Sequence, residues 1–276
     1  MLVREANRVF SRALSSAAAA VAATALVGLG LAPLSATAQR SESSVKPPVN
    51  PTPNELLARH AAAVLGQFDT SAHRTRYTRE RVEPVPGVTI TTERFQRWPS
   101  EIVTKVTDPM GGVQYHGFDG KIAWEIGADG KPRLVTGSDA QTERVYAMFY
   151  DGLLAAPARG DLATVGEVDF EGEAAFDVSL KEPPASATAV VPSWYFSKSR
   201  GVFVGQVLRR TGETGAETMR VLLQDYKSFG GMLVATRRLT RSAGREVVQV
   251  IDDIQWDSVP DRNFELPDSV RALIKP

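Results

Sequence analysis

The side chains that could carry out chemistry are few in this chain of 276 residues, which has no cysteine and only three histidines. Without cysteine there is no thiol nucleophile, disulfide or thiolate zinc site. His60, His73 and His116 lie far apart, and none has a second histidine at metal-ligand spacing. The G-x-S-x-G, HExxH, Walker and G-x-G-x-x-G motifs are also missing from the sequence. We therefore interpret the histidines as structural or solvated, and predict no catalytic residue, metal or cofactor.

Asp252 is the one carboxylate whose position raises a question. Within REVVQVIDDIQW, two-residue alternation places it on the same face as Val250 and Ile254. A carboxylate on a buried face is costly unless it is paired or hydrogen-bonded. Asp252 is therefore either a polar contact inside a cavity or part of a β-bulge that returns it to water, and we favour the bulge.

Charge excludes one class of partner. The chain has 32 basic and 32 acidic residues, and a nucleic-acid binder needs a basic surplus for its phosphate contacts. The basic runs at 74–76 and 237–238 have acidic residues nearby, which is typical of solvated strand faces. We predict no nucleic-acid partner.

The N-terminal segment is typical of an export signal. Arg4, Arg8 and Arg12 precede an alanine-rich apolar run, and Ala36-Thr37-Ala38 has the form of a cleavage site. We predict a signal peptide at 1–38, cleaved near Ala38, and hence a periplasmic protein. Residues 39–53 are rich in proline and serine and are predicted to be a flexible linker, which leaves one domain at 54–276.

Two helices and many short strands are expected in that domain. Thr52-Pro53-Asn54-Glu55 has the form of a capping box, and apolar residues at helical spacing follow it as far as Leu65. A second helix is predicted from Asp139 to about Leu154, with Ser138 as its cap. The remaining sequence alternates with period two between turn residues such as Asp119-Gly120 and Asp129-Gly130, which indicate two-residue hairpins. These patterns predict a mainly β, antiparallel protein.

The order of several short motifs resembles the LolA family of periplasmic lipoprotein carriers and its relatives. The segments that carry the resemblance are Phe95-x-Arg97-Trp98, Phe118-Asp119-Gly120-Lys121-x-x-Trp124, Tyr195-Phe196-Ser197-x-Ser199-x-Gly201, Asp225-Tyr226-Lys227-x-Phe229-Gly230-Gly231 and Phe264-x-Leu266-Pro267. LolA has an Arg-Pro pair shortly before the first of these segments. This chain has Arg94 there without a proline, so we assign LolA's arginine role to no residue.

The resemblance implies an unclosed antiparallel β-barrel, here of about 11–12 strands, wrapped around an N-terminal helix and a mid-chain plug helix. It also implies an apolar cavity for acyl chains and no enzymatic activity. Aromatic residues at strand spacing belong to the core more often than to a ligand site, unless the sheet is open and curved. On that condition the candidate cavity residues are Phe95, Trp98, Trp124, Val145, Met148, Phe149, Leu153, Trp194, Phe196 and Trp256.

The leading hypothesis is a monomeric periplasmic carrier or sensor that binds the acyl chain of a lipid or lipoprotein and cooperates with an inner- or outer-membrane protein. The first alternative is an envelope structural or interaction module whose core is filled by its own side chains. The second is an exported hydrolase, which would require a histidine near a serine or carboxylate in one cleft.

Overall fold

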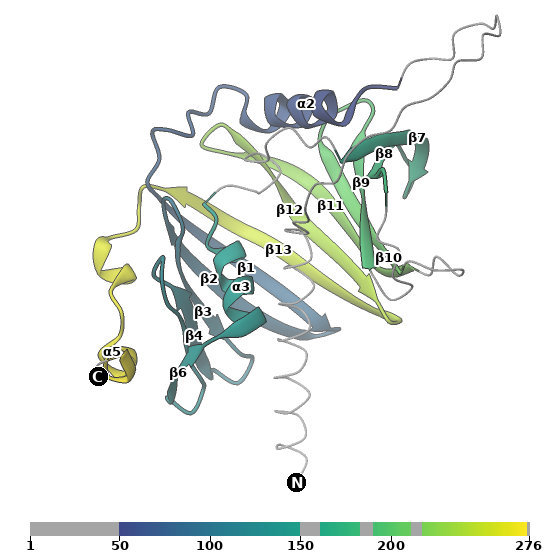
Figure 1. Cartoon of the computed structure of the whole chain (residues 1–276). Helices are drawn as coiled ribbons and strands as arrows, with labels where there is room; N and C mark the ends of the chain where they lie inside the picture. Colours follow the sequence, from purple (N-terminus) through teal and green to yellow (C-terminus); the bar gives the residue numbers. More distant parts are fainter. Residues whose placement is uncertain (1–49, 150–160, 183–189, 211–216, 275–276) are drawn as a thin grey trace, which may run out of the picture.

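The computed structural model describes residues 50–149, 161–182, 190–210 and 217–274, and in them one antiparallel sheet dominates (Figure 1). The helical elements are α2 (Pro53–Leu65), α3 (Gly137–Tyr146), the 3₁₀ turn η1 (Asp261–Phe264) and α5 (Asp268–Ile274). The strands are β1 (Thr75–Val85), β2 (Val88–Arg97), β3 (Glu101–Thr107), β4 (Val113–Phe118), β5 (Ala123–Ile126), β6 (Pro132–Val135), β7 (Leu162–Phe170), β8 (Glu173–Leu180), β9 (Val190–Ser197), β10 (Phe203–Arg210), β11 (Glu217–Phe229), β12 (Met232–Ser242) and β13 (Arg245–Trp256).

The sheet consists of two meanders that meet in its centre. Its order is β6-β5-β4-β3-β2-β1-β13-β12-β11-β10-β9-β8-β7, so the first and last strands pair and β6 and β7 form the edges. Because the two edge strands do not pair with each other, the barrel is unclosed, as predicted. It has 13 strands in the described residues, slightly more than the 11–12 expected.

Tight turns explain part of this topology. Gly230 and Gly231, with φ of 61° and 99°, join β11 to β12, because a two-residue turn between right-twisted strands needs positive φ at both positions. The two Asp-Gly loops differ from the prediction. At Asp119-Gly120 only the glycine has positive φ, and the Asp119 carboxylate accepts hydrogen bonds from the backbone N–H groups of Lys121 and Ile122. This aspartate stabilises a longer loop through its side chain.

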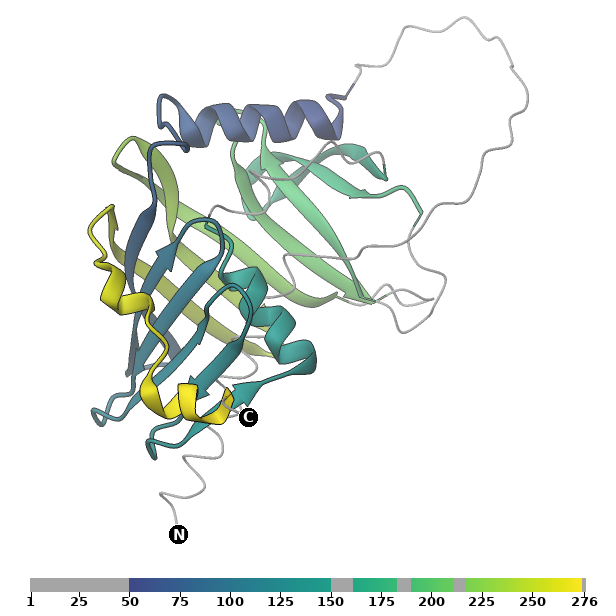
Figure 2. The same cartoon turned by 60° about the vertical axis from the view of Figure 1, so that its left-hand side comes forward.

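The two faces of the sheet have different coverings. We call inner the face that carries Arg76, Gln96, Ile102 and Phe118, which lie directly opposite one another on successive strands. Helix α3 packs on this face, through a cluster that includes Ile102, Phe118 and Ala147. The C-terminal segment covers the outer face of the first meander: η1 contacts β2 and β3, and α5 contacts β6. Figure 2 shows α3 and this yellow segment on opposite sides of the sheet.

Helix α2 begins and ends where the sequence predicts. The Glu55 N–H donates to Thr52 Oγ1 at 3.2 Å and the Thr52 N–H donates to the Glu55 carboxylate at 2.6 Å, which completes the capping box. Leu56, His60 and Val64 form its buried face. The helix crosses the end of the second meander (Figure 1), and its buried face points toward the sheet.

Helix α3 is shorter than predicted and begins two residues earlier, at Gly137 instead of Asp139. It ends at Tyr146, where the Gln96 side-chain amide donates to the carbonyls of Tyr146 at 3.0 Å and Met148 at 3.2 Å. The last carbonyls of a helix need partners from outside its regular hydrogen bonds, and the Gln96 side chain supplies one for Tyr146. Met148 and Phe149 therefore follow the helix, and residues 150–154 lie outside the described residues.

None of the helices in the described segments is both long and apolar enough to cross a membrane.

Candidate functional site

A cavity of about 320 Å³ lies on the inner face of the sheet, within the size range of small-molecule sites. Strands β1, β2 and β10–β13 supply most of its wall, and α2 and the C-terminal end of α3 supply the rest. The lining residues include His60, Val64, Arg76, Glu80, Arg94, Gln96, Val145, Tyr146, Met148, Phe203, Gln206, Val221, Leu223, Tyr226, Arg238 and Gln249.

The wall formed by β1 and β2, together with Gln249 of β13, is polar. Glu80 is only 1% exposed, and its carboxylate lies 2.6 Å from an Arg94 guanidinium nitrogen and accepts from Gln249 Nε2 at 2.6 Å. A buried charge requires such partners, because the interior solvates it poorly. Arg76 donates from Nε to Gln96 Oε1 at 2.9 Å, so Gln96 joins this arginine to the end of α3.

Tyr146 connects this polar wall to α3. The Arg94 guanidinium lies 5.8 Å from the centre of its ring, a cation–π distance. Burial raises the pKa of the Tyr146 phenol, which therefore stays neutral at any physiological pH. The Tyr146 hydroxyl is therefore a neutral group that can donate or accept a hydrogen bond.

The wall formed by β10, β11 and the helices is mainly apolar, with Val64, Val145, Met148, Phe203, Val221 and Leu223 among its members. Its polar side chains include His60 and Tyr226, which hydrogen-bond to the Phe203 backbone, and Gln206. Gln206 is 1% exposed, and neither its side-chain oxygen nor its nitrogen has a hydrogen-bond partner. The cavity thus combines apolar surface with a polar wall on one side and a few polar side chains, Gln206 among them, on the other.

Two predicted residues, Val145 and Met148, line the cavity. Phe149 and Trp256 pack just behind it, with their rings 6.1 Å apart, and the Arg76 guanidinium lies between 5 and 6 Å from each ring centre. Leu153 lies outside the described residues.

Trp194 and Phe196 are on the inner face but fill it. They are 8% and 2% exposed and pack in a cluster with Leu56, Phe176 and Phe203. This part of the half-barrel is occupied by the protein's own side chains, as aromatic residues on strands commonly are.

Three other predicted residues lie away from the cavity, which corrects the prediction. Phe95 is on the outer face beside Tyr77, because its neighbours Arg94 and Gln96 point inward. Trp124 lies opposite Gly117, also on the outer face, and is 2% exposed. Trp98 follows the end of β2, is 50% exposed and lies under the Arg74 guanidinium.

Asp252 confirms the bulge. The pairing of β1 with β13 shifts between Arg79 and Glu80, which leaves Asp252 as the extra residue. Its carboxylate accepts from Arg81 Nε and Nη2 at 2.8 Å, and these hydrogen bonds lower the pKa of Asp252. Because of the extra residue, Ile254 lies on the inner face together with Ile251, and both line the cavity.

The three histidines stabilise the fold. His60 Nδ1 accepts from the Phe203 N–H, His73 Nδ1 lies 2.7 Å from the Asp257 carboxylate, and His116 lies 3.2 Å from Glu143. Asp257 also accepts from the backbone N–H groups of residues 74 and 75. Together with the His73 pair, these contacts join the end of β13 to the start of β1. Within the described segments no three His, Cys, Asp or Glu side chains are grouped as metal ligands.

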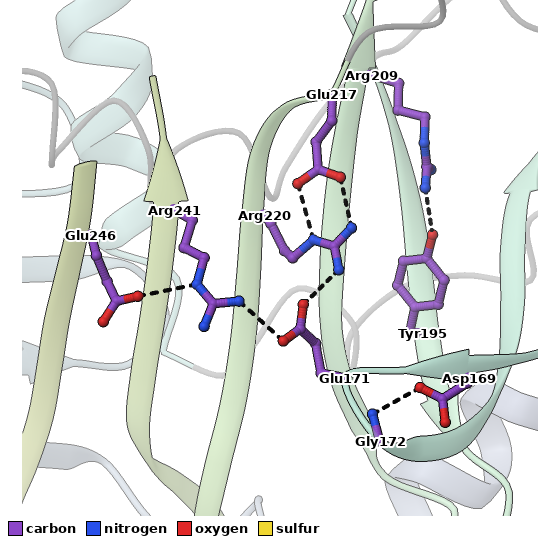
Figure 3. Close-up of polar contacts among 9 residues, drawn as sticks. All are labelled: Asp169, Glu171, Gly172, Tyr195, Arg209, Glu217, Arg220, Arg241 and Glu246. Atoms are coloured by element: carbon purple, nitrogen blue, oxygen red, sulfur yellow. Dashed lines mark hydrogen bonds and ion pairs between the residues drawn. The ribbon is translucent and has the colours of Figure 1, made fainter. Parts of the chain in front are cut away.

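A second polar cluster lies on the outer face (Figure 3). Glu171, in the turn between β7 and β8, forms ion pairs with Arg220 of β11 and with Arg241 of β12, the latter at 3.0 Å. Arg220 also pairs with Glu217, and Arg241 also pairs with Glu246. The two cations are matched by three carboxylates, so this cluster fastens the turn to the sheet.

The charge pattern of the sequence does not predict the polar residues of the cavity. It assigns Arg76 and Arg238 to solvated strand faces, whereas both line the cavity. Alternation in β1 was the available signal: Arg76, Thr78 and Glu80 share one face, and a run of polar residues on the inward parity indicates a polar wall. Gln206 lies among the apolar residues of β10 and had no distinguishing signal.

Comparisons with known proteins support the fold. No family model matches the chain, and no curated protein matches its sequence. A LolA-superfamily protein from Nitrosomonas europaea is 13% identical, with a TM-score of 0.50 over 79% of this chain and 99% of that chain. A DUF1329 family protein from Desulfovibrio piger (12% identity, TM-score 0.47, 76% of this chain and 95% of that chain) and an outer-membrane lipoprotein-sorting protein domain from Vibrio parahaemolyticus (9%, 0.46, 76% and 93%) also align. The likeness to the Nitrosomonas europaea protein shows that the chain has the LolA-like fold.

Proposed function

We propose that this protein is a non-catalytic carrier or sensor that holds the acyl chain of a lipid or lipoprotein in the cavity on the inner face. The observation that supports this function is the cavity itself, which lies between an unclosed sheet and two helices and has apolar side chains on one wall. A removable ligand needs such a concave, largely preformed space.

The energetics of this function are favourable. An acyl chain of ~15 methylenes gains roughly 0.8 kcal/mol for each one buried. Much of that gross energy offsets the loss of ligand freedom and the ordering of the site.

The cellular setting is proposed on the N-terminal sequence. Export by the segment 1–38, with cleavage near Ala38, would deliver a periplasmic monomer with residues 39–53 as a flexible linker and 54–276 as its domain. A carrier or sensor there would exchange its ligand, or its signal, with an inner- or outer-membrane protein.

Titration of the delipidated protein with a fluorescent fatty acid tests the function. We expect saturable binding of one ligand per chain, and we expect Leu223→Trp, which fills the cavity from β11, to weaken binding on the order of tenfold or more, about 1.4 kcal/mol. Val165→Trp is the matched control, because Val165 is 66% exposed on the edge strand β7. Absence of saturable binding by the wild-type protein would contradict the function.

The alternative is an envelope scaffold whose half-barrel is filled by its own side chains. The burial of Trp194 and Phe196 on the inner face of β9 favours it for that part of the sheet. A scaffold whose half-barrel is already filled predicts that Leu223→Trp overpacks the interior and lowers the free energy of unfolding, and that no fatty acid binds to either protein. The titration therefore distinguishes the two.

A further inference from the structure

Gln206 is a buried amide whose polar atoms do not stabilise the fold. It is 1% exposed, and within the described residues neither Oε1 nor Nε2 has a hydrogen-bond partner. By contrast, Gln96 accepts from Arg76 and donates to two backbone carbonyls, and Gln249 donates to Glu80. A buried amide without partners is costly, and an apolar side chain of similar size would remove that cost.

A bulge in β10 directs Gln206 into the cavity. The pairing of β10 with β9 shifts between Phe203 and Gly205, which leaves Val204 as an extra residue. Simple alternation would place Gln206 on the opposite face from Phe203, whereas with the extra residue both line the cavity. Gly205 has a φ of 154°, and a Cβ there would collide with the Val221 carbonyl oxygen. The strand is thus distorted at the point where it turns this amide inward.

The side chains around Gln206 are apolar. Trp194 on β9 and Val221 on β11 lie directly opposite it, and Phe203 and Leu223 line the cavity from β10 and β11. These neighbours enclose the amide in the unliganded fold, so a ligand must displace at least one of their side chains to reach it. Any polar atom of the ligand beyond those that bind the amide would itself be buried without a partner there.

The geometry of the amide defines the group that it can bind. Oε1 requires a donor and Nε2 an acceptor, and one edge of the planar amide presents both. A trans amide has its donor and acceptor on opposite edges, and an ester or an ionised carboxylate has no donor. A single hydroxyl can align with only one of the two atoms.

Two hydroxyls on neighbouring carbons meet this requirement. In the gauche conformer their oxygens lie side by side, so one hydroxyl can donate to Oε1 while the other accepts from Nε2. The pair is neutral, and its entry into an apolar environment does not require burial of a charge.

We propose that Gln206 is a specificity-determining residue that selects acyl lipids with two neighbouring free hydroxyls, such as a glycerol esterified once at its end. The hydroxyls bind the two amide atoms, and the acyl chain lies on the apolar wall that includes Val221 and Leu223. A sugar has the same pair of hydroxyls, but its additional hydroxyls would lack partners among these side chains. This inference rests on the proposed acyl-binding function and names the ligand class of the same cavity.

Two ligands that differ in one hydroxyl provide the test: a dodecanediol with hydroxyls on its first two carbons, and dodecanol. In displacement of a fluorescent fatty acid from the delipidated protein, we expect the wild type to bind the diol about tenfold more tightly than the alcohol. Gln206→Leu should reverse the order, because the second hydroxyl must still leave water but finds no partner.

A second pair of ligands distinguishes a glycerol from a sugar. Monododecanoylglycerol should displace the fatty acid at lower concentration than dodecyl glucoside, and Gln206→Leu should weaken the binding of the glyceride. Tighter binding of the glucoside by the wild type would overturn the assignment to a glycerol.

Two further variants complete the experiment. Gln206→Met is a second apolar replacement of similar length and replaces Gln206→Leu if that variant does not fold. Gln224→Leu is the matched control, because Gln224 accepts a hydrogen bond from Arg237 on the adjacent strand and is not among the residues that line the cavity. This control should keep the preference for the diol.

The possible failures are distinct. Equal or weaker affinity of the wild type for the diol, which would also follow if water alone satisfies Gln206, overturns the inference and leaves acyl binding intact. A preference for the diol that persists in Gln206→Leu or Gln206→Met overturns the role of this residue. Failure of the wild type to bind the fluorescent fatty acid or any of the four test ligands contradicts the proposed function itself.

Discussion

At the scale of single residues, the inner face depends on a buried charge. Glu80 is held between Arg94 and Gln249 at the centre of the sheet, where β1 and β13 pair. A buried ion pair adds little net stability, but removal of one partner leaves an uncompensated charge. The pair is therefore a sensitive point of the fold beside the cavity.

Arg94→Leu should lower the free energy of unfolding by about 3–5 kcal/mol, because it leaves the Glu80 carboxylate buried without its cation. The double variant Arg94→Leu, Glu80→Leu should recover most of this loss, since it removes both charges. Urea unfolding followed by circular dichroism measures each value.

Arg81→Leu is the control for this cycle, because the Arg81 side chain is 52% exposed and its pair with Asp252 lies at the surface. Its effect should stay within about 1 kcal/mol. If the double variant were as unstable as Arg94→Leu alone, the buried charge would not be the cause.

The sequence is least informative about single residues, namely about which face of the sheet each side chain lies on. It placed Phe95, Trp98 and Trp124 at the cavity because aromatic residues on a strand look alike whether they face a cavity, the core or a covered outer surface. Alternation along a strand shows which residues share a face but not which face lines the cavity, because here both faces are covered, one by α3 and the other by the C-terminal segment. Val145 and Met148 line the cavity, Val145 from the last turn of α3 and Met148 from the segment that follows it.

At the scale of elements, local signals decided what could be predicted. The limits of α2 followed from its capping box and from Gly66, which are contacts between near neighbours in the chain. The end of α3 could not be predicted in this way, because Gln96, 50 residues earlier, caps its carbonyls. Tertiary contacts override local propensity where a side chain from another element supplies the missing partner.

The outer-face cluster shows how one turn is attached to the sheet. Burial alone would raise the pKa of Glu171, but hydrogen bonds from Arg220 and Arg241 outweigh it and lower that pKa below its ordinary value of 4.5. A carboxylate with a lowered pKa in the folded state stabilises the protein above its unfolded pKa. The stabilisation disappears as the pH falls through the folded pKa.

Glu171→Gln should therefore reduce the free energy of unfolding at pH 7, and the difference from wild type should shrink as the pH falls below 4.5. Thermal or urea unfolding at a series of pH values measures this difference. Glu167→Gln, which removes an exposed pair with Lys198, should have little effect at pH 7. A Glu171→Gln difference that grows on acidification would contradict the assignment.

At the scale of the whole molecule, the mainly β class and the unclosed antiparallel architecture followed from the repeated alternation of short strands and from the family resemblance. The central pairing of β1 with β13 joins the two ends of the domain. No local sequence pattern specifies the pairing of two strands so far apart in the chain, because this pairing depends on how the whole described sheet twists and curves. The same curvature creates the cavity on which the proposed function depends.

Native mass spectrometry of the full chain, expressed with its N-terminal segment and purified gently from the periplasm, tests that function most directly. We predict a protein that begins at Gln39 and carries one non-covalent acyl lipid, which denaturation in organic solvent releases. A bare chain that also acquires no adduct after incubation with acyl lipids would contradict the account.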